Sequence, residues 1–336
     1  MKPQIVVRDL CKTYRVPERE EGLVATLRGL IHRRYRHVPA VNKITFTVNA
    51  GEVIGFIVAN GAGKTTTLKM LSGLLHPTSG EALVEDFIPW QRHTEYLRRI
   101  SLVMANKNQL NWENTAMDSF RVLAEIYGVP PRHFRRTLDE LITLLDMEGL
   151  LPQLVRNLSL GQRMKCELVA ALLHQPRVIF MDEPTLGLDV TMQLNVRRFL
   201  AAYNQRHEAT MIVTSHYMAD VTALCSRVIL IDKGQILYDG ELPALAERIA
   251  PFKLIRLTVG GEAGLNVDDV LSGLSRSVTV VERNGRRFSL RVGKADAANT
   301  VVGLLSKLPV IDVTVEDPPV EAVIDQIYRE GIGTWT

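Results

Sequence analysis

The sequence predicts an α/β fold with a mixed sheet and a helical insertion, followed by a small α+β domain. Three observations carry this prediction. An apolar run at 53–58 leads through a glycine-rich turn into a helical pattern, a second apolar run at 178–181 ends in two acids, and short strand and helix patterns alternate after Pro251. A chain of 336 residues is long enough for two domains, which we place at 1–250 and 251–336.

The composition is that of a globular protein, with 46% hydrophobic and 23% charged residues. A net charge of +3 is too small to indicate a nucleic-acid partner. The three cysteines, Cys11, Cys166 and Cys225, show no metal-ligand spacing, and such sparse use favours a reducing compartment. No apolar run approaches the roughly 18–20 residues that span a bilayer, so we expect a cytoplasmic protein unless a partner holds it at a membrane.

The first part of the chain is expected to hold two strands and a helix. Residues 4–14 begin with an apolar run and predict a strand that ends at Tyr14, whose ring could stack on a purine or simply pack. Between residues 21 and 35 apolar residues recur at helical spacing, with arginines on the other face. Such a basic amphipathic helix either rests on anionic lipid or packs on its own domain. The alternation at 44–48 predicts a further strand.

The most informative stretch is the glycine-rich turn after the run at 53–58. Backbone N–H groups in such a turn point at a phosphate chain, and the N-terminus of the following helix adds its partial positive charge. In this pattern Lys64 reaches the outer phosphates and the Thr65 hydroxyl ligates Mg²⁺. The turn therefore predicts a P-loop that binds a nucleoside triphosphate, rather than an ordinary glycine turn before a helix. The residues expected to bind the nucleotide here are Val58, Ala59, Asn60, Gly61, Ala62, Gly63, Lys64, Thr65 and Thr66.

After the P-loop helix the pattern returns to strands and then becomes helical. A turn at 76–80 precedes a short strand at 81–84, and a strand at 100–104 leads into a polar loop. From 114 to 151 the apolar residues keep helical spacing throughout. We therefore expect a helical subdomain, about 107–160, inserted into the α/β domain.

A second candidate site lies where the run at 178–181 ends in Asp182 and Glu183. Ligands of parallel sheets gather at the carboxyl ends of the strands. Asp182 is expected to hold Mg²⁺ directly or through water and Glu183 to polarise the attacking water; the alternative is an acidic turn that closes a core strand. A third strand, 211–215, ends at His216, which we expect to contact the γ-phosphate at the same edge of the sheet.

A segment between the two sites resembles a known family. The signature L-S-G-G-Q of the ATP-binding cassette (ABC) ATPases is closely matched by Leu158-Ser159-Leu160-Gly161-Gln162. Over about residues 4–245 the order of motifs is also similar: aromatic residue, P-loop, Q-loop, signature, acidic strand end, D-loop and switch histidine. More narrowly, the segment Lys107-Asn108-Gln109-Leu110 looks like that of the ATPase subunits of bacterial ABC-2-type exporters.

The resemblance implies an ATPase with ATP and Mg²⁺ bound between two cassettes. Each P-loop would be closed by Ser159, Gly161 and Gln162 of a second copy or a homologous chain. Export would proceed through a separate transmembrane permease of the ABC-2 type, which would hold the chain at the inner face of the cell membrane. The residues implied in catalysis are Lys64, Asn106 of the Q-loop, Glu183, Asp189 of the D-loop and His216, and Tyr14 would meet the purine.

Besides Leu160 in the signature and Ala105 before the Q-loop residue, three residues depart from the family pattern. Val58 stands for the first P-loop glycine, Ala59 for a frequent proline, and Asn106 for the Q-loop glutamine. If position 58 needs a positive φ, the strain is on the order of 1–3 kcal/mol. Asparagine is one methylene shorter than glutamine, which reduces its reach to Mg²⁺ and water. Because the other catalytic residues remain, we predict hydrolysis that is weakened at most and not lost.

Two other functions fit parts of the pattern. A nucleotide-gated binding or regulatory cassette would close on ATP but barely hydrolyse it, as the departures at Val58 and Asn106 allow. A soluble, non-transport ABC ATPase would act on the ribosome or DNA. Such relatives usually carry two cassettes or a long coiled-coil insertion, and this chain shows neither pattern.

The tail predicts a ferredoxin-like domain with the order β-α-β-β-α-β. Asn284-Gly285 marks a hairpin turn within it. Regulation, dimer contact and ligand sensing stay open, because a fold does not define a function. The expected strands are 254–259, 278–282, 287–292 and 310–315, and the expected helices are 267–274, 296–308 and a last one at 319–328.

Overall fold

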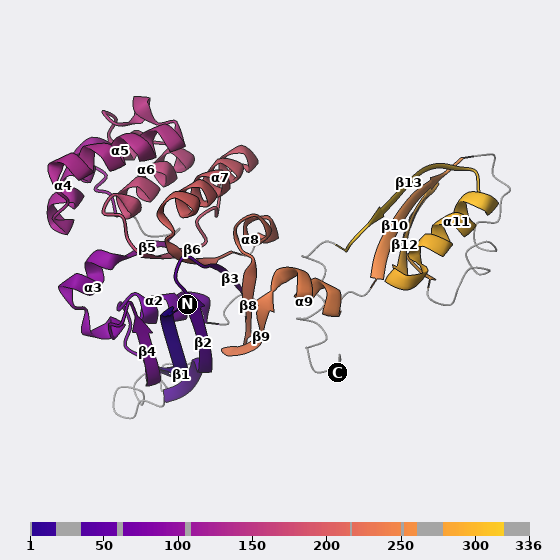
Figure 1. Cartoon of the computed structure of the whole chain (residues 1–336), viewed down its shortest axis with the longest axis horizontal. Helices are drawn as coiled ribbons and strands as arrows, with labels where there is room; N and C mark the ends of the chain where they lie inside the picture. Colours follow the sequence, from indigo (N-terminus) through magenta and orange to yellow (C-terminus); the bar gives the residue numbers. More distant parts are fainter. Residues whose placement is uncertain are drawn as a thin grey trace, which may run out of the picture. The chain divides into compact units, whose positions relative to one another are not determined.

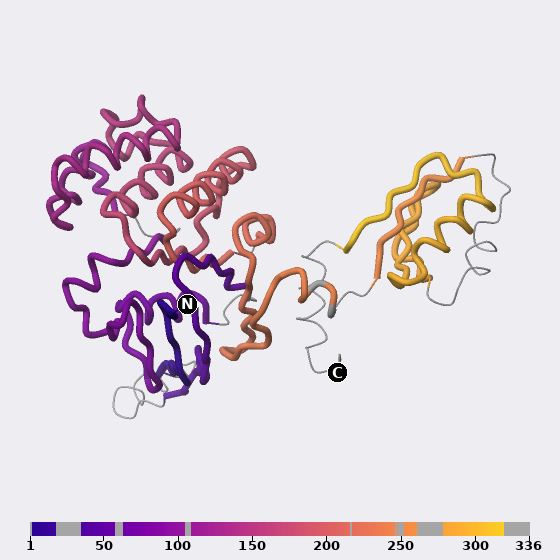
Figure 2. The backbone as a smooth tube through the Cα atoms, viewed as in Figure 1, coloured from indigo at the N-terminus to yellow at the C-terminus, as the bar shows by residue number. Residues whose placement is uncertain are grey.

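The computed structural model divides into two compact units, Met1–Leu242 and Pro243–Thr336 (Figure 1, Figure 2). This division falls shortly before the boundary that the sequence suggests after residue 250. The structure describes residues 2–17, 35–58, 63–104, 109–215, 217–249, 252–260 and 278–318.

The first unit begins with an antiparallel sheet in the order β2-β1-β4. Its strands are β1 (Pro3–Pro17), β2 (Tyr35–Asn49) and β4 (Ser79–Val84). β1 and β2 are longer than the apolar patterns suggest because the two strands pair with each other from end to end. The helix expected between residues 21 and 35 falls almost entirely outside the described residues.

The second sheet of this unit has the order β5-β6-β7-β3-β8-β9. It is mixed, since β9 runs antiparallel to β8 while the other neighbours are parallel. β6 and β7 are buried at every position, as expected for apolar strands covered on both faces. The predicted α/β class with a mixed sheet is thus confirmed. The strands are β3 (Val53–Val58), β5 (Ile100–Met104), β6 (Val178–Asp182), β7 (Thr210–Thr214), β8 (Arg227–Asp232) and β9 (Gln235–Glu241).

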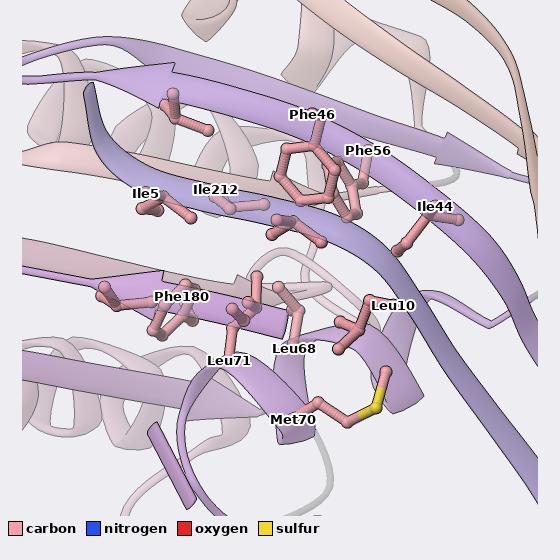
Figure 3. Close-up of a cluster of buried hydrophobic side chains, with 14 of the residues drawn as sticks. Ile5, Leu10, Ile44, Phe46, Phe56, Leu68, Met70, Leu71, Phe180 and Ile212 are labelled. Carbon is pink, nitrogen blue, oxygen red and sulfur yellow. The ribbon is translucent and has the colours of Figure 1, made fainter. Parts of the chain in front are cut away.

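The main core lies between these two sheets and helix α2 (Lys64–Leu71), as Figure 3 shows. Phe46 of β2 meets Phe56 of β3 edge to face, with ring centroids 5.3 Å apart. Leu68 and Leu71 insert into the same core from α2. This apolar anchorage fixes the helix against the sheet and thereby fixes the position of its N-terminus.

The helical insertion expected at 114–151 contains two helices with a break between them. Its first helix ends at Gly128, which adopts φ 67°, and the next helix starts with Pro131. A left-handed glycine followed by proline ends one helix and begins another. Helices α4 and α5 therefore form two separate elements.

The described helices beyond α2 are α3 (Thr94–Arg99), α4 (Ala116–Tyr127), α5 (Pro131–Leu145), α6 (Leu160–Leu172), α7 (Val190–His207), α8 (Met218–Leu224), α9 (Leu242–Ile249) and α11 (Ala297–Lys307). Short 3-10 turns cover Pro89–Gln91, Glu148–Leu150, Val155–Asn157 and Lys294–Asp296. No helix in the described part of the chain is long and apolar enough to cross a membrane.

The second unit contains a four-stranded antiparallel sheet in the order β11-β12-β10-β13. The hairpin turn between β11 and β12 contains Gly285 with φ 58°, as the Asn-Gly pair predicts. Apolar side chains of β10 and β12 form its core with Leu304 of α11. The helices expected at 267–274 and 319–328 lie outside the described residues, so the ferredoxin-like order stays a prediction. The strands are β10 (Phe252–Val259), β11 (Val278–Asn284), β12 (Arg287–Gly293) and β13 (Val310–Glu316).

Candidate active site

Helix α2 begins where the glycine-rich turn ends. Gly63 precedes it with φ 104°, and a Cβ atom at this position would lie 2.3 Å from the carbonyl oxygen of Ala40. Only glycine therefore fits between β2 and the start of the helix. The first N–H groups of α2 and its dipole favour an anion at this end. The other expected cradle residues, Ala59, Asn60, Gly61 and Ala62, lie outside the described part of the chain.

The first turn of α2 and the end of β6 meet through two polar contacts. Lys64 is buried, and its Nζ lies 3.3 Å from Oε1 of Glu183. The Thr65 hydroxyl donates a hydrogen bond of 2.7 Å to Oδ2 of Asp182. The structure thus brings together the four side chains for which the sequence predicts phosphate, metal and water chemistry.

Asp182 is held from its other side by a residue that the sequence reasoning missed. The hydroxyl of Thr214, at the end of β7, donates to Oδ1 of Asp182 at 2.7 Å. Thr214 is fully buried next to apolar strand residues. A hydroxyl in a buried strand needs a hydrogen-bond partner, and that requirement was the available signal. The two hydroxyls leave the carboxylate oriented toward the start of α2.

The backbone strain lies at a different residue from the one that the sequence suggests. Val58 ends β3 in regular pairing with Ile231 and is not among the described residues with positive φ. Glu183 instead has φ 56°, and its N–H donates to the Thr214 carbonyl oxygen at 3.0 Å. Such a conformation costs on the order of 1–3 kcal/mol in a non-glycine residue and tends to occur at functional sites.

Tyr14 lies beside the P-loop helix. Its hydroxyl is 3.4 Å from the hydroxyl of Thr66, and 36% of the residue is exposed. Lys12 Nζ stands 5.6 Å from the centre of the same ring. The ring is thus exposed next to the first turn of α2, and its stacking on a purine stays a prediction.

The signature segment forms the N-terminus of α6. Ser159 is the N-cap, and its Oγ accepts from the N–H of Gln162 at 3.2 Å. Gln162 in turn accepts from the N–H of Ser159 through Oε1 at 2.9 Å. This capping box gives Gln162 a structural task in addition to the predicted nucleotide contact. Gly161 leaves room for Met192 of α7, which comes within 3.0 Å of the position of a Cβ atom.

Asp189 of the D-loop begins the next helix. Its Oδ1 accepts from the N–H of Met192 at 2.8 Å, so the carboxylate caps α7. Because Met192 also packs against Gly161, the D-loop and the signature form one group of contacts. The predicted residues thus fall into two separate groups of contacts. The signature and D-loop group contains Ser159, Gly161 and Asp189. The group at the start of α2 and the end of β6 contains Lys64, Thr65, Asp182 and Glu183.

The two remaining predicted catalytic residues, Asn106 and His216, lie outside the described residues. Their neighbours show where the chain leaves the sheet. Met104 at the end of β5 is in register with Asp182, and Asp182 is in register with Thr214 at the end of β7. Both segments therefore leave the sheet at the edge where Asp182 and Glu183 lie.

Sequence reasoning also missed a buried carboxylate on α6. Glu167 is 5% exposed and accepts from the N–H groups of Gln109 and Leu110, the former at 2.9 Å to Oε2. Burial raises the pKa of Glu167 above its usual value, against the effect of these two donors. The signature helix thereby holds the chain just beyond the Q-loop. An acid within an otherwise apolar helix face was the signal available in the sequence.

Comparisons with known proteins identify the family that this chain resembles. The family description "ABC transporter" matches residues 41–186, and "EvrA-like ABC transporter, C-terminal domain" matches residues 251–316. The chain is 34% identical over 210 residues to the ABC transporter ATP-binding protein NatA of Bacillus subtilis (strain 168), which covers 62% of this chain and 85% of NatA. It is 32% identical over 219 residues to the bacitracin transport ATP-binding protein BcrA of Bacillus licheniformis, covering 64% of this chain and 69% of BcrA.

The names of two other relatives state opposite directions of transport. "Nod factor export ATP-binding protein I" of Burkholderia orbicola (strain AU 1054) is 32% identical over 219 residues, covering 65% of this chain and 71% of that protein. "Methionine import ATP-binding protein MetN 2" of Enterococcus faecalis (strain ATCC 700802 / V583) is 30% identical over 209 residues, covering 61% of this chain and 60% of that protein.

Solved structures share the fold. The ATP-binding subunit of an ABC transporter superimposes with a TM-score of 0.60 at 23% identity, covering 73% of this chain and 92% of that one. The ATP-binding cassette MJ0796, in a dimeric post-hydrolysis state with ADP and Pi, gives a TM-score of 0.58 at 20% identity. The match covers 70% of this chain and 98% of MJ0796. From the site geometry, the matched domains and the identity to NatA, we conclude that this chain belongs to the ABC transporter family as an ATP-binding, ATP-hydrolysing subunit.

Proposed function

We propose that the chain drives export through a separate membrane-spanning permease of the ABC-2 type. The observation that carries the chemical part is the meeting of Lys64 and Thr65 with Glu183 and Asp182 at one end of the parallel strands. Phosphoryl transfer needs mainly positioning and charge neutralisation. A lysine, a hydroxyl and two carboxylates at a helix N-terminus supply those functions.

In this proposal each side chain has one task in hydrolysis. Lys64 binds the outer phosphates and gives up its contact with Glu183 to do so. Glu183 then orients and polarises the attacking water, while His216 contacts the γ-phosphate and Asn106 the metal and the water. Tyr14 stacks on the purine. These roles follow the predicted motif. The contact of Lys64 with Glu183 and that of Tyr14 with Thr66 support the part that the structure describes.

Thr65 and Asp182 would hold Mg²⁺. A hydroxyl and a carboxylate oxygen 2.7 Å apart are hard oxygen donors, which Mg²⁺ prefers together with water and phosphate oxygens. The described residues contain no cluster of three or more His, Cys, Asp or Glu side chains that could hold a metal alone. This fits an ion that nucleotide phosphates help to bind. The ion would neutralise the charge that develops on the phosphates.

Two cassettes would together form two nucleotide sites at their interface. The contacts of Ser159 and Gly161 belong to a different group from those of Lys64 and Thr65, which supports a nucleotide shared between the P-loop of one copy and the signature of another. Asp189 would stand at this interface through its cap on α7. MJ0796, a cassette that shares this fold, is dimeric in a post-hydrolysis state with ADP and Pi.

Export is supported by the names of relatives and by the sequence segments typical of the ABC-2 branch. Nod factor export ATP-binding protein I is such a relative, while the methionine importer shows that the family also works in the other direction. The permease would hold the chain at the inner face of the membrane. Co-purification with a multispanning protein encoded beside this chain would support the pairing, and accumulation of a substrate inside cells that lack either gene would support export.

The test of the enzymatic part compares the wild type with Glu183→Gln. We expect wild-type chain to release phosphate from ATP in the presence of Mg²⁺, and the variant to bind ATP equally well but turn it over roughly 10²–10⁴-fold more slowly. In ATP the variant should remain dimeric by light scattering, since its nucleotide is not consumed. Glu148→Gln, an exposed acid outside the site, serves as the control. Tight ATP binding without phosphate release by the wild type would favour the nucleotide-gated alternative.

A further inference from the structure

A fully buried carboxylate outside the catalytic group connects two of its loops. Asp220 lies on α8, with none of its surface exposed. Its Oδ2 accepts hydrogen bonds from the hydroxyls of Ser215, at 2.8 Å, and Thr185. Both hydroxyl residues are themselves buried to 99%. A single carboxylate oxygen thus joins two segments that are 30 residues apart in the sequence.

Each of these segments carries a residue implicated in hydrolysis. Thr185 comes two positions after Glu183, in the turn in which the N–H of Leu188 donates to the Thr185 carbonyl oxygen. Ser215 comes one position before residue 216, and its Oγ accepts from the N–H of Tyr217 at 3.0 Å. The N–H of Asp220 donates to the Tyr217 carbonyl oxygen at 3.0 Å. The chain on both sides of position 216 is therefore fastened to Asp220.

The third partner comes from the helix that the D-loop begins. Nε of Arg197, on α7, lies 3.0 Å from Oδ1 of Asp220, and the arginine side chain is 12% exposed. The two atoms face each other as an ion pair rather than along a hydrogen-bond direction. Asp189 caps the same helix. The contacts of Asp220 thus extend to the loop after Glu183, the loop around position 216 and the D-loop helix.

Stability alone does not explain this arrangement. A buried ion pair contributes little net stability, and well-packed apolar residues of similar volume often replace one at no loss. A fully buried carboxylate has directional acceptors, however, and can hold several donors at fixed distances from one another. The main effect of Asp220 is therefore to fix the distances between its hydrogen-bond donors, and not to add stability.

We propose that Asp220 is a positioning residue for ATP hydrolysis, which sets the loop of Glu183 and the loop of residue 216 at a fixed separation. This inference rests on the proposed ATPase site but names a residue outside it. Substitution should leave Lys64 and Thr65 in place at the start of α2 to bind the nucleotide, while it displaces the groups that act on the water and the γ-phosphate. The expected consequence is a loss of turnover without a loss of nucleotide affinity.

The test replaces the carboxylate by its neutral isostere, Asp220→Asn. In the amide one of the two oxygens becomes an NH2 group, so an N–H donor would face either the two hydroxyls or Arg197, and the charge opposite Arg197 would be lost. We expect kcat to fall by about 10- to 100-fold, the effect of a small misplacement of catalytic groups, while the Kd for a fluorescent ATP analogue changes less than about twofold. In a His216→Ala background the same substitution should lower kcat by a smaller factor, because the two changes disturb one step.

Two controls separate positioning from damage to the fold. Val221→Ala removes packing from the neighbouring, fully buried position of α8 and should lower thermal stability without a comparable fall in kcat. If Asp220→Asn does not fold, Ser215→Ala removes one hydroxyl from the same carboxylate and should still lower kcat several-fold at an unchanged Kd. An unchanged kcat in a folded Asp220→Asn protein, or in Ser215→Ala, would overturn the proposal. So would equal factors in the wild-type and His216→Ala backgrounds. A wild type that does not hydrolyse ATP would instead refute the proposed function.

Discussion

The Cδ2 atom of Leu160 lies 3.2 Å from the position that a Cβ atom would take on Gly187. Leu160 is the residue that replaces a glycine of the family signature, and Gly187 belongs to the D-loop. Gly187 also has φ 75°, a conformation that other residues rarely adopt. The leucine side chain thus packs on the D-loop, and a Cβ atom at Gly187 would require this side chain to move by a few tenths of an ångström.

Gly187→Ala is expected to destabilise the D-loop and lower ATPase activity. The left-handed conformation alone costs on the order of 1–3 kcal/mol in a non-glycine residue, and the Leu160 contact adds to it. Adding Leu160→Ala should relieve only the contact, so activity should recover in part. Gly149→Ala is the control, because a Cβ atom there meets nothing within 4 Å. Thermal unfolding and phosphate release measure the effects; equal behaviour of the two alanine variants would contradict the expectation.

Asp182→Asn is expected to weaken Mg²⁺ binding in the nucleotide complex. The substitution removes the charge at the carboxylate that Thr65 and Thr214 orient. We expect the Mg²⁺ concentration for half-maximal activity to rise roughly 10- to 100-fold, the range found when support around a metal is lost. A Mg²⁺ titration at saturating ATP measures this. Asp139→Asn, on the exposed face of α5, should leave the titration unchanged.

Glu167→Gln should change the pH dependence of stability. Burial raises the pKa of this carboxyl above its usual value, so its neutral form is favoured in the folded protein. A raised pKa in the folded state gives a stabilising contribution that is complete below the unfolded value and is lost as pH rises through the folded pKa. The wild type should therefore lose stability relative to Glu167→Gln as the pH rises above the usual glutamate pKa of about 4.3. Urea unfolding at several pH values measures the difference, and a constant difference would contradict the assignment.

Glu167→Ala tests the same side chain as a hydrogen-bond acceptor. It leaves the N–H groups of Gln109 and Leu110 without their carboxylate. Each buried donor left unsatisfied costs about 1–3 kcal/mol, so this variant should be less stable than Glu167→Gln at every pH. Urea midpoints of the two variants at pH 7 decide this, and equal midpoints would show that the carboxyl holds neither N–H group.

Thiol reactivity should distinguish the three cysteines. Burial raises the pKa of the Cys166 and Cys225 thiols to about 12, so almost no thiolate forms at pH 8. Cys11 is only half-buried. A disulfide reagent should therefore modify one thiol per chain rapidly in the native protein and all three after denaturation. The rapid phase should vanish in Cys11→Ser, and a second rapid thiol would show that one of the buried positions is accessible.

Leu290→Ala should destabilise the second unit without affecting nucleotide turnover. Leu290 is fully buried in the core of β10, β12 and α11, where removal of a leucine side chain costs about 2–5 kcal/mol. Because this core is separate from that of the first unit, we expect one calorimetric transition to shift while ATPase activity stays unchanged at 25 °C. Val302→Ala, which is 66% exposed, should shift nothing. A matching loss of ATPase activity would show that the two units depend on each other.

The sequence by itself determined the features that depend on neighbouring residues. The glycine turn before α2, the apolar runs of β3 and β6 and the Asn-Gly hairpin are all visible locally. Backbone conformation and burial at such positions follow from a few adjacent side chains. The P-loop, the acidic pair and the α/β class could therefore be predicted before any contact was known.

Only the tertiary structure decided which distant residues support these groups. The Thr214 hydrogen bond to Asp182, the hold of Glu167 on Gln109 and the strain at Glu183 each depend on strands and helices that are far apart in the sequence. Local patterns carry no information on such pairings, because the same buried threonine or acid fits many partners. The packing of β6 against β7 determines the partner of Thr214, and the packing of α6 against the chain beyond β5 determines the partner of Glu167.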